Sequence, residues 1–192
     1  MIEVERKREV GGDAEKIKAR LADLGYREAA SSTETDTYYS RPDVDFLETV
    51  ECLRVRRRPG FAEITYKPAS TAATRSADGV IAKRETNLVL PGDGQAADAE
   101  ALLEAIGMVP LARVEKARAS YQRPDLDGVT VAVDTVTGAG VFVEVEVIGE
   151  NAETAAVLMA EVEQENGLDA YPVVALPYRD LVLKTDSHLT RR

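Results

Sequence analysis

Charged residues at alternate positions mark short segments of this sequence. Glu3, Glu5 and Lys7 follow this spacing at the start of the chain, and Arg54 and Arg56 follow it near the first third. Successive side chains of a β-strand point to opposite faces, so each set would share one face. Like charges on one face repel unless a group of opposite sign lies between them. Carboxylates suit hard metal ions and guanidinium groups suit phosphate oxygens, so the pattern indicates a cavity that holds a metal ion and a polyanion.

A third segment, with Glu144 and Glu146 between valines 143, 145 and 147, repeats the acidic pattern. Taken alone, each segment has a simpler explanation, because solvated strand faces often carry Glu and Lys. The repetition of this pattern favours a charged cavity over solvated strand faces, since nearly every expected strand carries ionisable groups at alternate positions. Unpaired charges inside a protein are expensive, so a water-filled tunnel holding metal and polyphosphate accounts for both signs.

Composition narrows the class of protein. The net charge of −10 argues against non-specific nucleic-acid binding, which needs a basic surface, and one cysteine excludes an intrachain disulfide. No long apolar run suggests a membrane span, and the first residues do not resemble a signal peptide, so we expect a cytoplasmic protein. The single histidine, His188, makes Ser-His catalysis and histidine-rich zinc sites improbable. Any chemistry must rely on carboxylates, lysines, arginines, tyrosines and a hard metal.

Hydrophobic periodicity and turn residues predict the elements that position these charges. Asp13 is expected to cap a helix with Ile17, Leu21 and Leu24 on its buried face, and a second helix over 97–106 is expected to bury Leu102, Leu103 and Ile106. A third helix is predicted over 152–166, a short one after Pro177, and a flexible loop over 68–79. Strands are predicted near residues 2–7, 36–40, 52–58, 62–67, 81–90, 114–121, 129–134 and 141–148.

The predicted fold class is α+β: an eight-stranded, mostly antiparallel, closed or nearly closed β-barrel with helices packed outside. Residues 19–26 (ARLADLGY) resemble residues 101–108 (ALLEAIGM), which suggests a weak internal duplication. We expect one domain over 1–185 and a flexible tail over 186–192.

Several segments resemble the CYTH superfamily, the triphosphate tunnel metalloenzymes. EVERK at 3–7 fits its ExExK signature, and residues 36–56, through LRVR, are similar to class IV adenylate cyclases. Further similar segments follow in family order: ITYK at 64–67, Arg84-Glu85, EKAR at 115–118, residues 133–147 and YRDLVL at 178–183. The chain departs from the pattern at Pro68-Ala69, where Gly-Pro is usual. In the segment Arg84-Glu85-Thr86-Asn87, either an asparagine replaces one expected carboxylate or the register of the strand differs.

The resemblance implies roles for the charged residues. A divalent cation, Mg²⁺ or Mn²⁺, would be held by the paired glutamates, with assistance at that or a second metal from Asp134 and Glu85. Phosphate oxygens would be bound by Lys7, Arg54, Arg56, Lys67, Lys116 and Arg118, with Arg84 as a further candidate. Lys7, Glu85 and Asp134 would take part most directly in catalysis. The metal ligands would be Glu3, Glu5, Asp134, Glu144 and Glu146.

Three activities remain open at this point. The similar segments favour a class IV adenylate cyclase, which forms cyclic AMP and pyrophosphate from ATP. The alternative is a triphosphatase acting on tripolyphosphate or thiamine triphosphate, and the third is a binding module that senses ATP or polyphosphate without turning it over. The expected partner is therefore a small-molecule triphosphate, with neither nucleic acid nor membrane. A homodimer is compatible with the resemblance.

Overall fold

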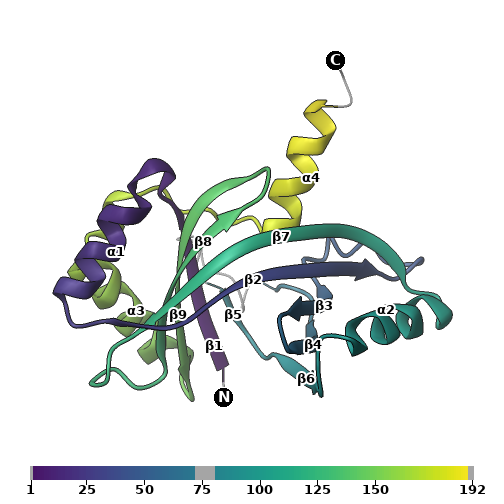
Figure 1. The fold of residues 1–192 in the computed structure, drawn as a ribbon, viewed down its shortest axis with the longest axis horizontal. Helices are drawn as coiled ribbons and strands as arrows, with labels where there is room; N and C mark the ends of the chain where they lie inside the picture. The colour runs from purple at the N-terminus through teal and green to yellow at the C-terminus, as the bar shows by residue number, and fades with distance from the viewer. Residues whose placement is uncertain (1, 72–80, 190–192) are drawn as a thin grey trace.

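The computed structural model describes residues 2–71 and 81–189. Figure 1 shows one curled sheet with helices outside it. The strands are β1 (Ile2–Glu9), β2 (Arg27–Ser40), β3 (Cys52–Arg58), β4 (Phe61–Lys67), β5 (Ile81–Lys83), β6 (Thr86–Leu90), β7 (Val109–Gln122), β8 (Val129–Val136) and β9 (Gly140–Gly149). The α-helices are α1 (Ala14–Asp23), α2 (Gln95–Ala105), α3 (Ala152–Glu165) and α4 (Tyr178–Leu189).

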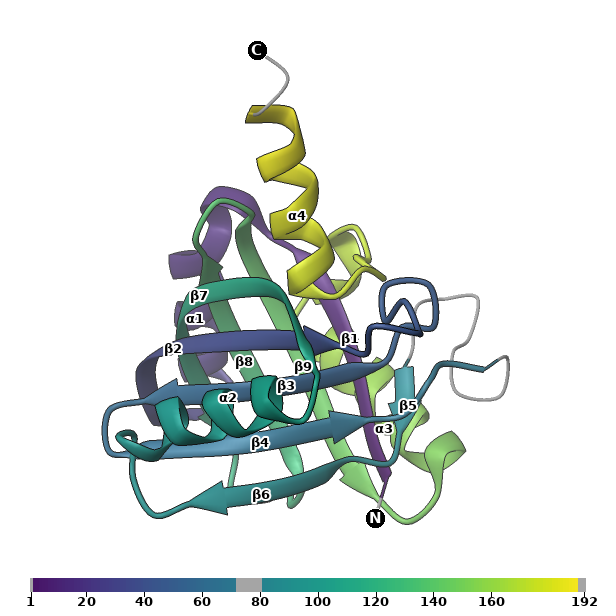
Figure 2. The same cartoon turned by 90° about the vertical axis from the view of Figure 1, so that its right-hand side faces the viewer.

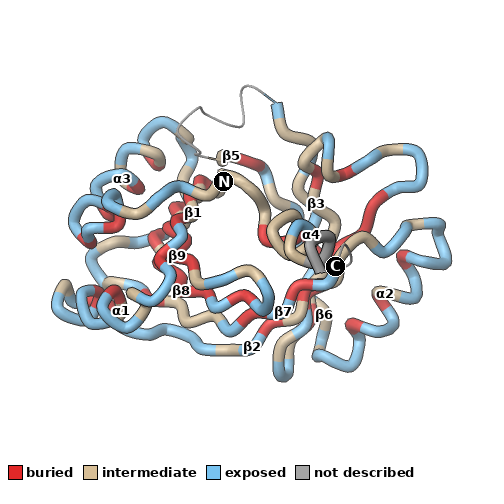
Figure 3. The backbone as a smooth tube through the Cα atoms, turned by 90° about the horizontal axis from the view of Figure 1, so that it is seen from above, coloured by how far each residue is buried: buried red, intermediate tan, exposed pale blue. Residues whose placement is uncertain are grey.

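The strands form one antiparallel sheet in the order β5-β1-β9-β8-β7-β2-β3-β4-β6. Seen from above, they curl around a central axis (Figure 3). The predicted α+β fold with outer helices is confirmed, but the described sheet has nine strands rather than eight. The expected strand over 81–90 is two strands, because β5 pairs with β1 whereas β6 pairs with β4. Arg84 and Glu85 join them, so the chain itself connects the two opposite edges of the sheet.

An internal two-fold arrangement matches the repeated sequence. The long strands β2 and β7 pair at the middle of the sheet, α1 leads into β2, and α2 leads into β7. Both helices end in the same way at a glycine with positive φ: Tyr26 donates its N–H to the Leu21 carbonyl, and Met108 to that of Leu103. One repeat is β1-α1-β2-β3-β4 and the other is β6-α2-β7-β8-β9. The first strand of each repeat pairs with the last strand of the other, since β1 pairs with β9 and β6 pairs with β4.

Apolar side chains pack on the outer face of this sheet, which leaves the inner face for charged residues. Val4, Leu21 and Met159 belong to a core where α1 and α3 cover one half. Figure 2 shows α2 lying along the outer face of β3 and β4. The buried outer-face residues Arg6 and Arg8 both bind Glu163 of α3, at 2.7 Å from each Nη2 to its Oε2.

Two helix predictions need correction. Helix α2 buries Ala96, Ala99 and Leu103, so its contact stripe is narrower than expected. Leu102 and Ile106 are 57% and 67% exposed because they fall outside that stripe. Asp13 precedes α1 but makes no side-chain cap, because its carboxylate accepts a hydrogen bond from Tyr171 Oη at 2.7 Å.

The C-terminal helix α4 begins after Pro177 as predicted and continues to Leu189, into the segment expected to be a tail. It projects away from the sheet (Figure 1). Of the loop predicted over 68–79, residues 72–79 lie outside the described residues. None of the described helices combines the length and apolar character that crossing a membrane requires.

Candidate active site

The curled sheet surrounds a cavity of about 240 Å³. Its wall is formed by the inward-facing positions of several strands, because every second side chain points to the inner face. The structure brings most of the sequence-predicted site residues together in this wall: Glu3, Glu5, Lys7, Arg54, Arg56, Lys67, Glu85, Lys116, Arg118, Glu144 and Glu146. Asp134 and Arg84 are not among the lining residues.

One wall of the cavity is acidic. Strands β1 and β9 are neighbours, with Glu5 opposite Glu146 and Lys7 opposite Glu144. Burial, opposed by the charge of Lys67 and aided by the charges of Glu5 and Glu146, raises the pKa of Glu3 to about 8. Burial also raises the pKa of Glu146, despite the opposing charge of Arg118. Crowded carboxylates of this kind favour a bound cation.

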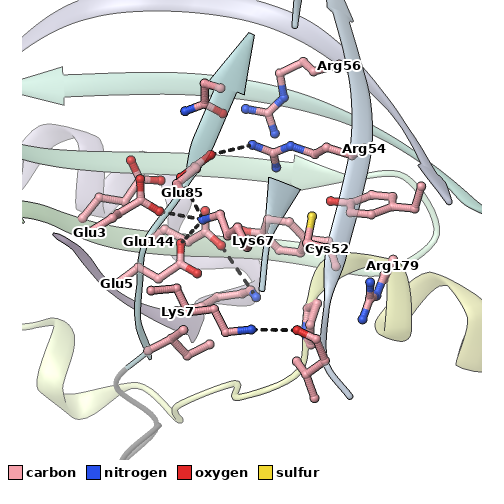
Figure 4. Close-up of a pocket in the computed structure, with 18 of the residues that line it drawn as sticks. Glu3, Glu5, Lys7, Cys52, Arg54, Arg56, Lys67, Glu85, Glu144 and Arg179 are labelled. Carbon is pink, nitrogen blue, oxygen red and sulfur yellow. Dashed lines mark hydrogen bonds and ion pairs between the residues drawn. The ribbon is translucent and has the colours of Figure 1, made fainter. Parts of the chain in front are cut away.

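Lys67 of β4 is one basic residue that reaches across to this acidic wall. Its Nζ lies 2.6 Å from Glu3 Oε1, 3.2 Å from Glu85 Oε2 and 3.8 Å from Glu5 Oε2 (Figure 4). Burial alone would lower the pKa of Lys67, but the charges of Glu5 and Glu3 hold it well above its ordinary value. Lys67 is therefore a charged residue that neutralises the acidic wall.

The opposite wall carries the two arginines of β3 (Figure 4). Asp36 of β2 provides an anion that contacts both of these arginines. Arg56 donates two hydrogen bonds of 2.7 Å to its carboxylate, and Arg54 Nη1 lies 3.6 Å from Oδ2. Burial opposes ionisation of Asp36, but the charges of Arg56 and Arg54 lower its pKa. Glu34, also buried, lies 3.2 Å from Arg56 Nη1.

Asp134 lies beneath the lining and positions Arg118. It is fully buried, and its two carboxylate oxygens accept hydrogen bonds of 2.8 and 2.6 Å from Arg118 Nε and Nη2. Tyr178 Oη donates to the same carboxylate at 2.9 Å. Arg118 also contacts Glu146 at 3.1 Å and Glu144. A role for Asp134 as a metal ligand stays a prediction, whereas its contact with Arg118 is direct.

The first turn of α4 also contributes to the cavity. Tyr178 and Arg179 line it. Lys7 Nζ lies 4.2 Å from the centre of the Tyr178 ring, donates to the Leu176 carbonyl at 2.9 Å and lies 3.6 Å from Glu144. Arg179 is buried and donates to the carbonyls of Phe46, at 2.6 Å, and Glu51.

Sequence reasoning missed residues of two kinds. Lys83 and Asn87 line the cavity together with Glu85, whereas Arg84 is exposed. Alternation centred on Glu85 predicts both positions on the same face as Glu85, whereas the resemblance points to Arg84 as the basic residue of this segment. Tyr178 and Arg179 come from a helix, so no strand alternation could have indicated their place in the wall.

The carboxylates fit a divalent cation by their chemistry. Glu3, Glu5, Glu144 and Glu146 offer oxygen donors, which Mg²⁺ and Mn²⁺ prefer, on adjacent strands. Among the described residues no three carboxyl, thiol or imidazole groups are already gathered as a metal site. Lys67 and Arg118 contact these carboxylates instead. The four carboxylates suit a divalent cation. For the ion to bind, Lys67 and Arg118 would have to move away from these carboxylates.

A curled antiparallel sheet with opposed acidic and basic walls defines a tunnel protein suited to a cation and a polyanion together. The family model of the CYTH domain matches residues 1–171, and the chain belongs to this family. The family is that of the triphosphate tunnel metalloenzymes, and membership implies a divalent metal cation. The family relationships also identify a phosphoryl-transfer enzyme.

Individual relatives agree with this membership. The chain is 28% identical over 147 residues to "Putative adenylate cyclase MJ0240" of Methanocaldococcus jannaschii, covering 76% of this chain and 77% of that protein. It matches the structure of PH1012 from Pyrococcus horikoshii with a TM-score of 0.77 and 25% identity, over 94% of this chain and 99% of the other. An adenylyl cyclase-like Hippeastrum protein, whose structure is described as revealing a dominant triphosphatase activity, shares the fold at a TM-score of 0.63 and 15% identity, over 92% and 91% of the two chains.

Proposed function

We propose that this protein is a metal-dependent enzyme that binds a triphosphate in its tunnel and acts as a class IV adenylate cyclase. The observation that carries the proposal is the opposition of the glutamates of β1 and β9 to the arginines of β3 across one cavity. The relative from Methanocaldococcus jannaschii, named as an adenylate cyclase, supports the choice of reaction. The substrate would be ATP, and the products cyclic AMP and pyrophosphate.

In this mechanism the chain's own residues bind and orient the substrate. The paired glutamates Glu3, Glu5, Glu144 and Glu146 would hold the cation, which when bound neutralises charge on the phosphate oxygens. Arg54 and Arg56 would bind phosphate oxygens through their guanidinium groups, whose planar donors suit such oxygens. Arg118, fixed by Asp134, would stabilise charge developing on the leaving pyrophosphate. The ribose 3′-oxygen would attack the α-phosphorus, and no histidine is required.

A second candidate function is hydrolysis of an inorganic triphosphate. The residues that favour it are Tyr38 and Tyr178, the aromatic side chains among the described lining residues. Both are buried, and their hydroxyl groups face Asp36 and Asp134. Neither ring is open to stack on a nucleobase, and most of the lining is charged. A short inorganic polyphosphate therefore suits this wall well.

Product identification tests the proposal. The protein is incubated with ATP or tripolyphosphate in the presence of Mg²⁺ or Mn²⁺. Cyclic AMP with pyrophosphate supports the cyclase, and orthophosphate supports the triphosphatase. Unchanged substrate bound with measurable affinity would contradict both enzymatic candidates and identify a binding module.

A further inference from the structure

Lys83 differs from the other basic residues of the cavity in forming no ion pair with a carboxylate of the described residues. It ends β5, is 6% exposed, and lines the tunnel. Its Nζ donates to the Val50 carbonyl at 2.7 Å. No carboxylate of the described residues forms an ion pair with it, although each other lysine and arginine of the described lining has one.

An ammonium group in this position is costly. Burial removes most of its hydration, and a carbonyl oxygen replaces only part of the lost interaction. Burial lowers the pKa of Lys83 to about 8, with the nearby cations Lys67 and Arg179 acting in the same direction and Cys52 and Glu5 acting against it. The structure therefore holds a cation that an anionic ligand entering the tunnel would neutralise.

The carbonyl that Lys83 binds belongs to a constrained segment. Val50 has φ +54°, a conformation that β-branched residues rarely adopt. Arg179 binds two further carbonyls of the same segment, those of Phe46 and Glu51. Val50 and Glu51 themselves line the cavity. The contact from Lys83 thus connects the inner wall of the tunnel to residues 46–51.

We infer that Lys83 is a further binding residue for the triphosphate, and that it exchanges the Val50 carbonyl for a phosphate oxygen when the tunnel fills. The inference rests on the proposed function, because the anion it names is the triphosphate. Binding then releases the Val50 carbonyl and loosens residues 46–51. Lys83 acts in binding, and it need not take part in bond cleavage.

The matched pair Lys83→Gln and Arg84→Gln tests this inference. Both variants remove one positive charge from adjacent positions, but Arg84 is exposed and lies outside the lining. Glutamine at position 83 keeps an N–H donor for the Val50 carbonyl. Affinity for tripolyphosphate with Mg²⁺ is measured by calorimetry. Lys83→Gln should weaken it about 10- to 100-fold, as expected for the loss of a charge-assisted hydrogen bond, and Arg84→Gln should change it less than about twofold.

Two further measurements complete the test. Lys83→Arg should recover most of the affinity, because it keeps the charge. Hydrogen exchange over residues 46–51 should rise when tripolyphosphate binds the unsubstituted protein, and should not respond in Lys83→Gln. Equal affinity of Lys83→Gln and the unsubstituted protein would overturn the inference and leave the proposed function standing. If the unsubstituted protein fails to bind either tripolyphosphate or ATP, the proposed function fails and the inference falls with it.

Discussion

Arg118 donates two hydrogen bonds to the fully buried Asp134, and this pair fixes a guanidinium group against the wall of the tunnel. The same guanidinium reaches Glu144 and Glu146 of β9. Arg118 of β7 therefore contacts carboxylates of both β8 and β9. Its orientation depends on a residue that does not itself line the cavity.

Asp134→Asn should impair turnover by misplacing Arg118. Without the negative charge at position 134, Arg118 keeps only its contacts with Glu144 and Glu146. These contacts should draw its guanidinium group towards β9. Because small displacements of catalytic groups can cost about 100-fold in rate, we expect kcat to fall by about 10- to 100-fold. Steady-state kinetics measure the change, with the exposed Asp127→Asn as the control. Unchanged kcat in Asp134→Asn would contradict the positioning role.

The two arginines of β3 should respond differently to truncation. Arg54→Ala should raise KM for the triphosphate about 10- to 100-fold with little loss of stability, because Asp36 keeps its pair of hydrogen bonds from Arg56. Arg56→Ala should raise KM and also lower the free energy of unfolding, by about 3–5 kcal/mol, because it leaves the buried Asp36 without that pair. Kinetics and urea unfolding measure both effects. An unchanged KM in both variants would count against phosphate binding by these residues.

The pKa of Glu3 predicts how metal binding depends on pH. Its pKa of about 8 in the folded protein exceeds the ordinary 4.5, so the folded state holds a proton that the unfolded state releases. Stability of the metal-free protein should therefore fall as pH rises from about 4.5 to 8. Binding of Mg²⁺ should release this proton and tighten over the same interval. Calorimetric titrations of Mg²⁺ in buffers of different ionisation enthalpy measure the release.

Glu3→Gln supplies the control for that measurement. This variant cannot release a proton at position 3, so the number of protons released when Mg²⁺ binds should decrease. Affinity for Mg²⁺ that is independent of pH between 5 and 8 in the unsubstituted protein would show that Glu3 is not protonated as proposed.

Glu163 should contribute to stability without contributing to chemistry. It is the shared partner of Arg6 and Arg8 on the outer face of β1, away from the cavity. Glu163→Ala leaves two buried guanidinium groups without this partner, so unfolding free energy should fall by about 3–5 kcal/mol. The exposed Glu161→Ala is the matched control. Denaturant unfolding measures the difference, and equal stability of the two variants would refute the role of Glu163.

Much of the tunnel wall could be predicted from alternation alone. Glu5, Arg56 and Glu146 lie on well-formed strands whose inner faces follow the period of two, so their types and spacing were sufficient. The strand break at Arg84 could not be predicted, because it depends on β5 and β6 joining opposite edges of the sheet. The role of Asp36 could not be predicted either, because its partner Arg56 lies on another strand. Both features depend on contacts between separate strands, which the local sequence pattern does not specify.

The central claim is that a cation on the glutamates and a triphosphate on the arginines occupy one tunnel together. Its most direct test is calorimetric titration of tripolyphosphate with and without Mg²⁺, in the unsubstituted protein and in Glu5→Gln and Glu146→Gln. Mg²⁺ should tighten binding at least about tenfold in the unsubstituted protein, a coupling of about 1.4 kcal/mol, and much less in either variant. Both variants should lose metal-dependent turnover while staying folded, with a higher melting temperature without metal because acidic repulsion is relieved. Binding that Mg²⁺ does not tighten, or normal turnover in both variants, would contradict the account.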